Sequence, residues 1–384
     1  MNRIILFTLI SLLLCCSARN PNEIQNQLNS IAESYVKLVL EIGQYDEDFV
    51  DAYYGPEQNR PHPDSILSEF PYERIKALVT GLLYKLEQIN TDNLEEIIRL
   101  RHQFLQKQLI AVEAKADMIS GKHFSFDEES SLLYDAIAPH YSDEHFAVLV
   151  KELDQKLPGK GDILTRLTEF RKDFIIPEEK LKEVFKAAIQ EGRRLTREKI
   201  TLPDDENFVV EYVKDKPWGA YNWYKGNHFS VIQFNTDLPT FIERAVDLAC
   251  HEGYPGHHVY NTLLEQHLYK ERGWVEFSVY PLFSPQSLIA EGTANFGSDV
   301  AFRRQERIKF EKEVLFPLAG LDTTQTELYY EIIDLTSSLS FARNEANRNY
   351  LDGKISREER LEWLMKYALN SRQLAEKTVD FVDK

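Results

Sequence analysis

The chain has 384 residues, enough for one large or two ordinary domains with a sizeable core. It carries 45 lysines and arginines against 62 aspartates and glutamates, a formal net charge of −17, and has no basic run dense enough for a nucleic-acid patch. We therefore expect no nucleic-acid partner. The three cysteines are too few for a disulfide framework. The oligomeric state stays open.

The first 18 residues predict a secretory signal. Arg3 precedes an apolar run from Ile4 to Leu14 that is followed by small residues up to Ala18, and the run is too short to cross a bilayer. Lipoprotein processing would leave Cys16 as a lipidated N-terminus, whereas ordinary cleavage would follow Ala18. We therefore expect an exported protein, either periplasmic or anchored in a membrane as a lipoprotein through Cys16.

Residues 19–200 predict a helical scaffold that walls a cleft. Apolar side chains recur at helical spacing in Glu23–Ile42, Asn93–Ile119 and Ser142–Leu157, and again from Pro177 to about Ile200. A break is expected at Pro158–Gly161. We expect this region to form one compact unit with residues 201–384, the metal-binding catalytic region.

The pattern then changes to that of strands. Phe208–Val213 and Phe229–Asn235 are rich in β-branched and aromatic residues with partial alternation, and turn residues lie at Lys216–Gly219 and Lys225–Asn227. These features predict a small antiparallel sheet beside the next helix. An exposed sheet edge there could hold an extended peptide by main-chain hydrogen bonds; the alternative is a structural hairpin with both edges covered.

The helix that follows is predicted to begin with a capping box at Thr240–Glu243. Cys250 is interpreted as a small core residue. Asp247, one turn before His251, would either orient the His251 ring or pair with Arg244. The apolar stripe of the helix is expected to comprise Ile242, Val246, Ala249 and Gly253.

The segment His251-Glu-Gly-Tyr-Pro-Gly-His-His258 predicts a zinc site. Imidazole is a common zinc ligand, and the carboxylate of Glu252 lies where it could deprotonate a zinc-activated water. The usual zincin spacing places the second histidine four positions after the first, where this chain has Pro255. Because proline interrupts a helix, we expect a kink there and a second ligand displaced by two positions to His257, with His258 as the competing choice.

A catalytic zinc site needs a third protein ligand and leaves one position for water. Ser284-Pro285 predicts the start of another helix, and this helix carries Glu291. We predict Glu291 as the third ligand because small side chains around it would let the two helices approach closely. These small residues are Gly292, Ala294, Gly297 and Ser298.

These motifs resemble those of an uncharacterised bacterial family of helical proteins, many of them exported, with His-Glu-x-x-Pro-Gly-His and a later Glu-Gly-x-Ala. That family is similar in organisation to the gluzincin metallopeptidases, which bind zinc through two histidines and a downstream glutamate. Phe49–Pro56, Asn222–Asn227 and Asn235–Pro239 also look like family segments, so the resemblance extends over most of the mature chain. It implies a mainly α, multi-helix, gluzincin-like fold with His251, His257 and Glu291 as zinc ligands and Glu252 as the base.

The sequence thus predicts a hydrolase with one zinc ion per chain, a metallopeptidase that cleaves short peptides with Glu252 as general base. Arg343 would either hold a substrate carboxylate or pair with a nearby glutamate. His258 is assigned a catalytic role, as one of several candidate donors to the oxyanion. The other candidate donors are Tyr254, Tyr280, Tyr329 and Tyr330. Two alternatives are an exported metal-containing binding or scaffold protein without turnover, and a hydrolase of non-peptide amides.

Overall fold

The computed structural model describes residues 21–62, 68–92, 94–216, 218–237 and 239–383. The predicted signal and Cys16 lie outside these residues, so export and lipid anchoring stay predictions. Within the described ranges, no helix is both long enough and apolar enough to cross a membrane.

The described chain is mainly helical, as predicted. The helices expected in the first half are present as α1, α3, α5 and α7, and the predicted break at Pro158 follows the end of α5. The elements of this half are α1 (Pro21–Ile42), β1 (Val50–Tyr53), α2 (Tyr72–Glu87), α3 (Glu96–Ile119), α4 (Phe126–Tyr134), α5 (Asp143–Lys156), α6 (Ile163–Lys172) and α7 (Leu181–Arg197).

The second half contains the sheet and ten further helices among the described residues. Its strands are β2 (Asn207–Val213), β3 (Ala220–Tyr224), β4 (Phe229–Asn235) and β5 (Val279–Pro281). Its α-helices are α8 (Glu243–Leu248), α9 (His257–Leu264), α10 (Pro285–Asn295), α11 (Gly297–Ala301), α12 (Arg304–Phe310), α13 (Phe316–Ala319), α14 (Thr326–Leu339), α15 (Ala342–Leu351), α16 (Arg357–Tyr367) and α17 (Arg372–Val382). Three π-helical segments extend helices: Ala249–Gly253 after α8, Glu265–Lys270 after α9 and Glu311–Leu315 after α12.

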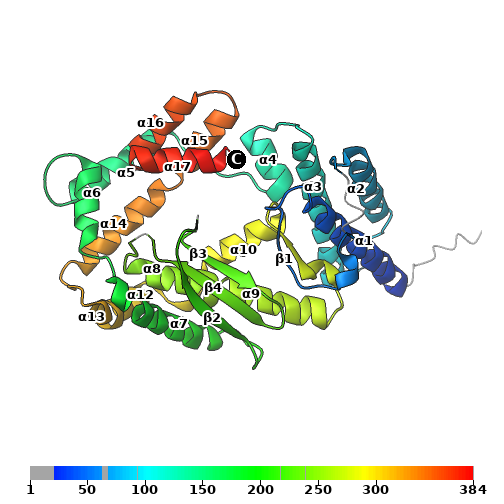
Figure 1. Cartoon of the computed structure of the whole chain (residues 1–384), viewed down its shortest axis with the longest axis horizontal. Helices are drawn as coiled ribbons and strands as arrows, with labels where there is room; N and C mark the ends of the chain where they lie inside the picture. The colour runs from blue at the N-terminus through cyan, green and yellow to red at the C-terminus, as the bar shows by residue number, and fades with distance from the viewer. Residues whose placement is uncertain (1–20, 63–67, 93, 217, 238, 384) are drawn as a thin grey trace, which may run out of the picture.

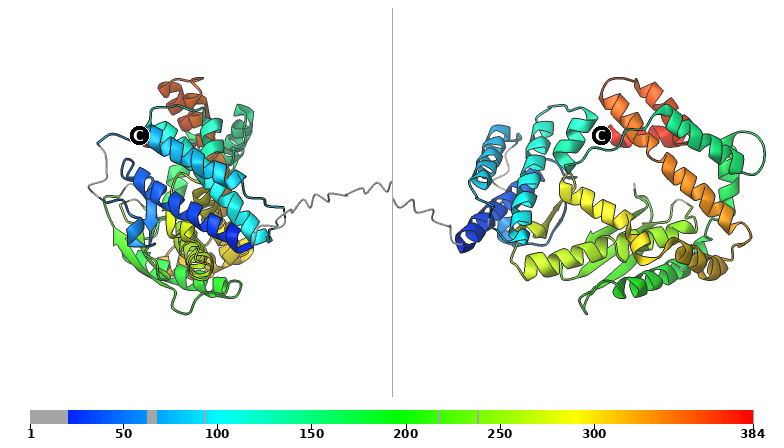
Figure 2. Two further views of the ribbon diagram at one scale, coloured as in Figure 1. Left: turned by 90° about the vertical axis from the view of Figure 1, so that its right-hand side faces the viewer. Right: turned by 180° about the vertical axis from the view of Figure 1, so that it is seen from behind.

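The helices form two groups on either side of the sheet (Figures 1 and 2). Helices α1, α2 and α3 share one apolar core with the segment around Trp274. A second, larger core joins α5–α8 and β4 to α13 and α14, so it combines residues from both predicted regions. The boundary near residue 200 therefore does not separate the cores.

The predicted sheet is present, but its antiparallel topology was wrong. The strand order is β2-β4-β3, with β2 parallel and β3 antiparallel to β4. Alternation along β4 buries Ser230, Ile232 and Phe234 against the helices, and Phe185 of α7 stacks on Phe234 at 4.2 Å. Alternation specifies which face of a strand is buried but not the direction of the neighbouring strand. The parallel pairing of β2 with β4, with β3 on the far side of β4, was therefore not predicted.

The two helix groups also meet on the side away from the sheet, where α4 contacts α15. Arg348 of α15 is buried there, and its guanidinium donates to Asp127 of α4 at 3.0 Å and to the carbonyl of Ala138 at 2.7 Å. Its third partner is Glu345. This contact joins residues that are far apart in the sequence and connects the two helix groups at the end of the molecule opposite the sheet (Figure 1).

Candidate metal centre

The helix that carries His251 begins later than predicted but buries the expected stripe. It starts at Glu243 without a side-chain cap, so the capping box at Thr240 was wrong. The Thr240 carbonyl instead accepts a hydrogen bond from Ile176. Cys250 is fully buried, which confirms its assignment to the core. The other buried positions on this face are Ile242, Val246, Ala249 and Gly253.

The predicted break at Pro255–Gly256 is present and returns the chain to His251. The π-helical segment ends at Gly253, Tyr254 is extended, and α9 begins at His257. The Gly256 amide donates to the Cys250 carbonyl at 2.8 Å. A Cβ at position 256 would lie only 1.9 Å from the His251 carbonyl oxygen. Pro255 interrupts the helix. Because only glycine fits this close approach at position 256, the chain can turn back and bring the second histidine towards the first.

The structure brings His251, His257 and Glu291 together, with one ligand atom of each within 4.8 Å of the others. The Nε2 atoms of His251 and His257 are 3.2 Å apart. Glu291 Oε1 lies 3.3 Å from His257 Nε2, and its Oε2 lies 3.6 Å from His251 Nε2. Zinc held tetrahedrally at 2.0–2.1 Å separates its ligand atoms by about 3.4 Å, so the cluster fits such an ion.

Helix α10 delivers Glu291 much as the small residues predicted. Ser284 caps its first turn by accepting from the Ser287 amide, and Pro285 follows at the first position. At Gly297 an added Cβ would lie 3.0 Å from the Cys250 carbonyl, so glycine permits a close approach of the two segments. Gly292 differs, because an added Cβ there would meet nothing within 4 Å. The side chain of Glu291 is half-exposed.

The electrostatics favour the metal-binding forms of His251 and Glu291, whereas His257 must lose a proton to bind a metal ion. Burial, followed by the charge of His257, lowers the pKa of His251 to about 4. Although burial opposes it, Glu291 raises the pKa of His257, and the hydrogen bond from His257 lowers the pKa of Glu291. His251 is therefore neutral and Glu291 ionised at pH 7, which are the forms that bind a metal ion.

Glu252 lies beside the cluster and is 5% exposed. Burial raises the pKa of its carboxyl to about 7, with a smaller opposing effect of His257. Its backbone carbonyl accepts a 2.6 Å hydrogen bond from the Asn222 side chain of β3. The carboxyl thus has a proton affinity suited to general acid–base chemistry at neutral pH.

His258 lies outside the cluster, which corrects its assignment as a catalytic group and as the competing ligand. Its ring is completely buried, with Nδ1 at 2.9 Å from Ser230 Oγ and Nε2 at 3.1 Å from Glu206 Oε2. Consecutive residues of a helix point about 100° apart, so His258 faces the sheet when His257 faces the cluster. The Tyr254 hydroxyl also donates a hydrogen bond to Glu206 at 2.6 Å, on the side of the helix away from the cluster, so it is not placed as an oxyanion donor.

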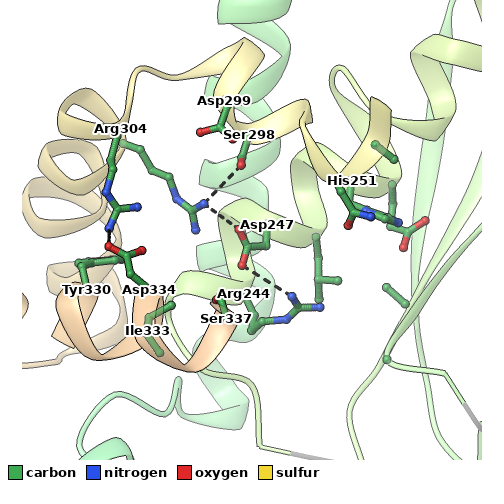
Figure 3. A pocket seen from close by; sticks show the side chains of 17 residues that line it. Arg244, Asp247, His251, Ser298, Asp299, Arg304, Tyr330, Ile333, Asp334 and Ser337 are labelled. Carbon is green, nitrogen blue, oxygen red and sulfur yellow. Dashed lines mark hydrogen bonds and ion pairs between the residues drawn. The ribbon is translucent and has the colours of Figure 1, made fainter. Parts of the chain in front are cut away.

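Two cavities adjoin the cluster, and His251 and Glu252 line both. The small cavity has a volume of about 250 Å³ and is bounded by β1, β3, α9 and α10. The large cavity has a volume of about 630 Å³ and extends towards α12 and α14 (Figure 3). Sequence reasoning missed three residues of the small cavity, Asp51, Tyr221 and Asn222, although two family-like segments contained Asp51 and Asn222.

The other predicted oxyanion donors and Arg343 lie in different parts of the structure. Tyr280 lines the small cavity and Tyr330 the large one, whereas Tyr329 donates to buried Glu243. Arg343 lies in a separate cavity that neither His251 nor Glu252 lines.

Asp247 does not orient His251. It accepts from Arg307 at 2.7 Å and lies 3.6 Å from Arg244 (Figure 3). Asn295 of α10 is the side chain that hydrogen-bonds His251.

No family model matches the chain, and no curated protein matches it in sequence. Among solved structures it is similar to a crystal structure from Colwellia psychrerythraea whose protein is provisionally described as a lipoprotein. The two share 16% sequence identity at a TM-score of 0.46, and the match covers 79% of this chain and 56% of the other. The chain thus spans little more than half the length of that protein, and a similarity this distant says nothing about function.

Proposed function

We propose that the protein is a zinc-dependent hydrolase, a metallopeptidase of gluzincin-like organisation that binds one zinc ion per chain and cleaves short peptides. The observation that carries this proposal is the cluster of His251, His257 and Glu291 beside a buried glutamate. The two imidazole Nε2 atoms are 3.2 Å apart, Glu291 Oε1 lies 3.3 Å from His257 Nε2, and Glu291 Oε2 lies 3.6 Å from His251 Nε2. Three protein ligands from two imidazoles and a carboxylate are typical of catalytic rather than structural zinc.

The chemistry divides between the bound ion and the residues around it. When bound, zinc supplies Lewis acidity that lowers the pKa of water and polarises a carbonyl group. Glu252 takes a proton from the attacking water and delivers it to the leaving nitrogen. Burial raises its pKa to about 7, which gives this carboxyl group a high proton affinity. A nearby cation favours the ionised carboxylate, so metal loading prepares Glu252 to act as the base.

Two tyrosines of the small cavity are suited to stabilise negative charge on the substrate carbonyl. Burial raises the pKa of both Tyr221 and Tyr280, so both phenols are protonated donors at neutral pH. Of the two, the Tyr280 hydroxyl has the weaker hydrogen bond, at 3.4 Å to Ser287. We propose Tyr280 as the oxyanion donor, because the Tyr221 hydroxyl already donates to Asp51.

The two cavities beside Glu252 and the strand edge next to them suit a peptide substrate. β3 is an edge strand of the described sheet, and its residues Ala220 to Asn222 line the small cavity. An edge strand pairs with an extended peptide through main-chain hydrogen bonds. The exposed edge expected from the sequence is therefore provided by β3, because β4, the last predicted strand, is central in the sheet.

The test is the variant Glu252→Gln, which keeps size and hydrogen bonding but cannot take a proton. We expect about one zinc per chain in both proteins and a fall in peptide hydrolysis of at least about 100-fold in the variant. Glu211→Gln, an exposed change on β2, is the matched control. Wild-type turnover in zinc-loaded Glu252→Gln would refute the mechanism. A zinc-loaded wild type that cleaves simple amides but no peptide in a diverse library would favour a non-peptide hydrolase, and cleavage of neither would favour a binding protein.

A further inference from the structure

The small cavity is lined by more acidic than basic side chains. Three carboxylates line it, those of Asp51, Glu252 and Glu291, and its lining residues, all in the described part of the chain, include no lysine or arginine. A bound divalent cation would be balanced by ionised Glu291 and Glu252. Asp51 would then still lack a close ion-pair partner, because the charges of His257 and Lys225 act on it from a greater distance.

Asp51 is held in place without a cation. It lies on β1, and its carboxylate accepts a hydrogen bond from the Tyr221 hydroxyl of β3. No lysine or arginine of the described ranges forms an ion pair with it, and burial raises its pKa. Buried carboxylates are normally paired, so this one is suited to a ligand that brings its own positive charge. Its oxygen also lies outside the group of three ligand atoms, so it is not placed as a further metal ligand.

A second acceptor borders the same cavity. Asn222 is 8% exposed, and its Oδ1 has no hydrogen-bond partner. The orientation of the amide is fixed, because the Glu252 carbonyl can only accept and therefore faces the Asn222 amide nitrogen at 2.6 Å. A carboxylate and an unpartnered amide oxygen among the residues that line one cavity match an ammonium group, which has three N–H donors and no acceptor.

The large cavity offers no comparable site for the other end of a peptide. Arg307 pairs with Asp247 at 2.7 Å, Arg244 lies 3.6 Å from the same carboxylate, and Arg304 pairs with Asp334 (Figure 3). Each of the three arginines in the described lining of this cavity thus already faces a carboxylate, and Arg244 and Arg307 share that of Asp247.

From these observations we propose that the small cavity binds the free α-amino group of a peptide, with Asp51 as its counter-ion and Asn222 as a second acceptor. This inference rests on the proposed function and deepens it: the substrate class is peptides with an unblocked N-terminus. The residues released from that end occupy the small cavity, and the remainder of the peptide extends from Glu252 into the large cavity.

The experiment uses the zinc-loaded full chain and pairs of probes that differ only in the amino group. Binding of alanine and N-acetylalanine is measured by calorimetry. Hydrolysis of trialanine amide and its N-acetylated form is followed by mass spectrometry. We expect the free amine to be preferred by about 10- to 100-fold in both assays, the range of one charge-assisted contact. Asp51→Asn, which keeps an acceptor for Tyr221, should abolish the preference, and Glu211→Gln should retain it.

The two hypotheses fail in different ways. Equal binding and cleavage of free and acetylated probes, or a preference that survives Asp51→Asn, would overturn the amino-group site while leaving the hydrolase intact. Tighter binding of alanine with no peptide cleavage would uphold the site and overturn the proposed function. If Asp51→Asn does not fold or loses zinc, the wild-type comparison alone decides, because it needs no variant.

Discussion

Replacing His257 and His258 separately by alanine should separate metal binding from stability. His257 borders the small cavity and has its Nε2 3.2 Å from that of His251. His258, the next residue, is completely buried and bonded to Ser230 and Glu206. Replacing His257 removes a proposed metal ligand, and replacing His258 removes a packed aromatic ring.

The magnitudes follow from these surroundings. His258→Ala leaves a cavity the size of an aromatic ring, which costs about 3–5 kcal/mol for comparable rings. Ser230 also loses its partner, whereas Glu206 keeps bonds from Tyr254 and Arg193 and stays paired. His257 lies against space that water can enter, so His257→Ala should cost only about 1 kcal/mol. It should, however, leave two ligands and abolish stable zinc binding.

The assay combines two measurements on each variant. Urea unfolding of the metal-free proteins gives the free energy of unfolding without the contribution of bound metal. Elemental analysis after zinc loading and dialysis gives the zinc content. The reasoning is refuted if His258→Ala loses zinc at unchanged metal-free stability while His257→Ala keeps it.

Gly256→Ala should lower zinc content sharply, because its Cβ would lie 1.9 Å from the His251 carbonyl oxygen. The control Gly292→Ala, with no atom within 4 Å of its Cβ, should retain zinc, and full occupancy in Gly256→Ala would contradict the role of this glycine. The free energy of unfolding should also decrease in acid because of Glu206. Burial opposes ionisation of this carboxyl group, but its hydrogen bonds outweigh burial and lower its pKa from 4.5 to about 2. This contribution is present above pH 4.5 and is lost as pH falls towards 2, by about 2 kcal/mol at pH 3. Urea unfolding at pH 6 and pH 3 should show a smaller loss for Glu206→Gln, and equal losses would exclude Glu206 as the source.

Local residue chemistry made the clustering of the candidate metal ligands predictable. Pro255 must interrupt a helix and Gly256 tolerates close backbone approach, so the chain reversal that brings a second histidine back towards His251 followed from two adjacent residues. The cap at Ser284 and the close approach at Gly297 were likewise recognisable from residue type. The capping box at Thr240 failed because Thr240 instead pairs through its backbone with Ile176, a contact between distant segments.

The walls of the site could not be predicted in the same way. Asp51 lies on a four-residue strand whose partner is β5, and no periodicity marks so short an element. Tyr221 and Asn222 lie on β3, a short segment between two predicted turns. Which of two adjacent histidines faces the cluster depended on where α9 restarts, and that position is set by the packing of Glu206 and Ser230 behind His258.

The three ligand atoms come from three separate helical segments: the π-helical extension of α8, the first turn of α9, and α10. In the described ranges the one cysteine, Cys250, is buried and free, so no disulfide links these segments. A bound ion would therefore act as a cross-link between them. Removing it would release the reversal at Gly256 and the approach of α10 together, so loss of metal and loosening of both cavity walls should occur as a single event.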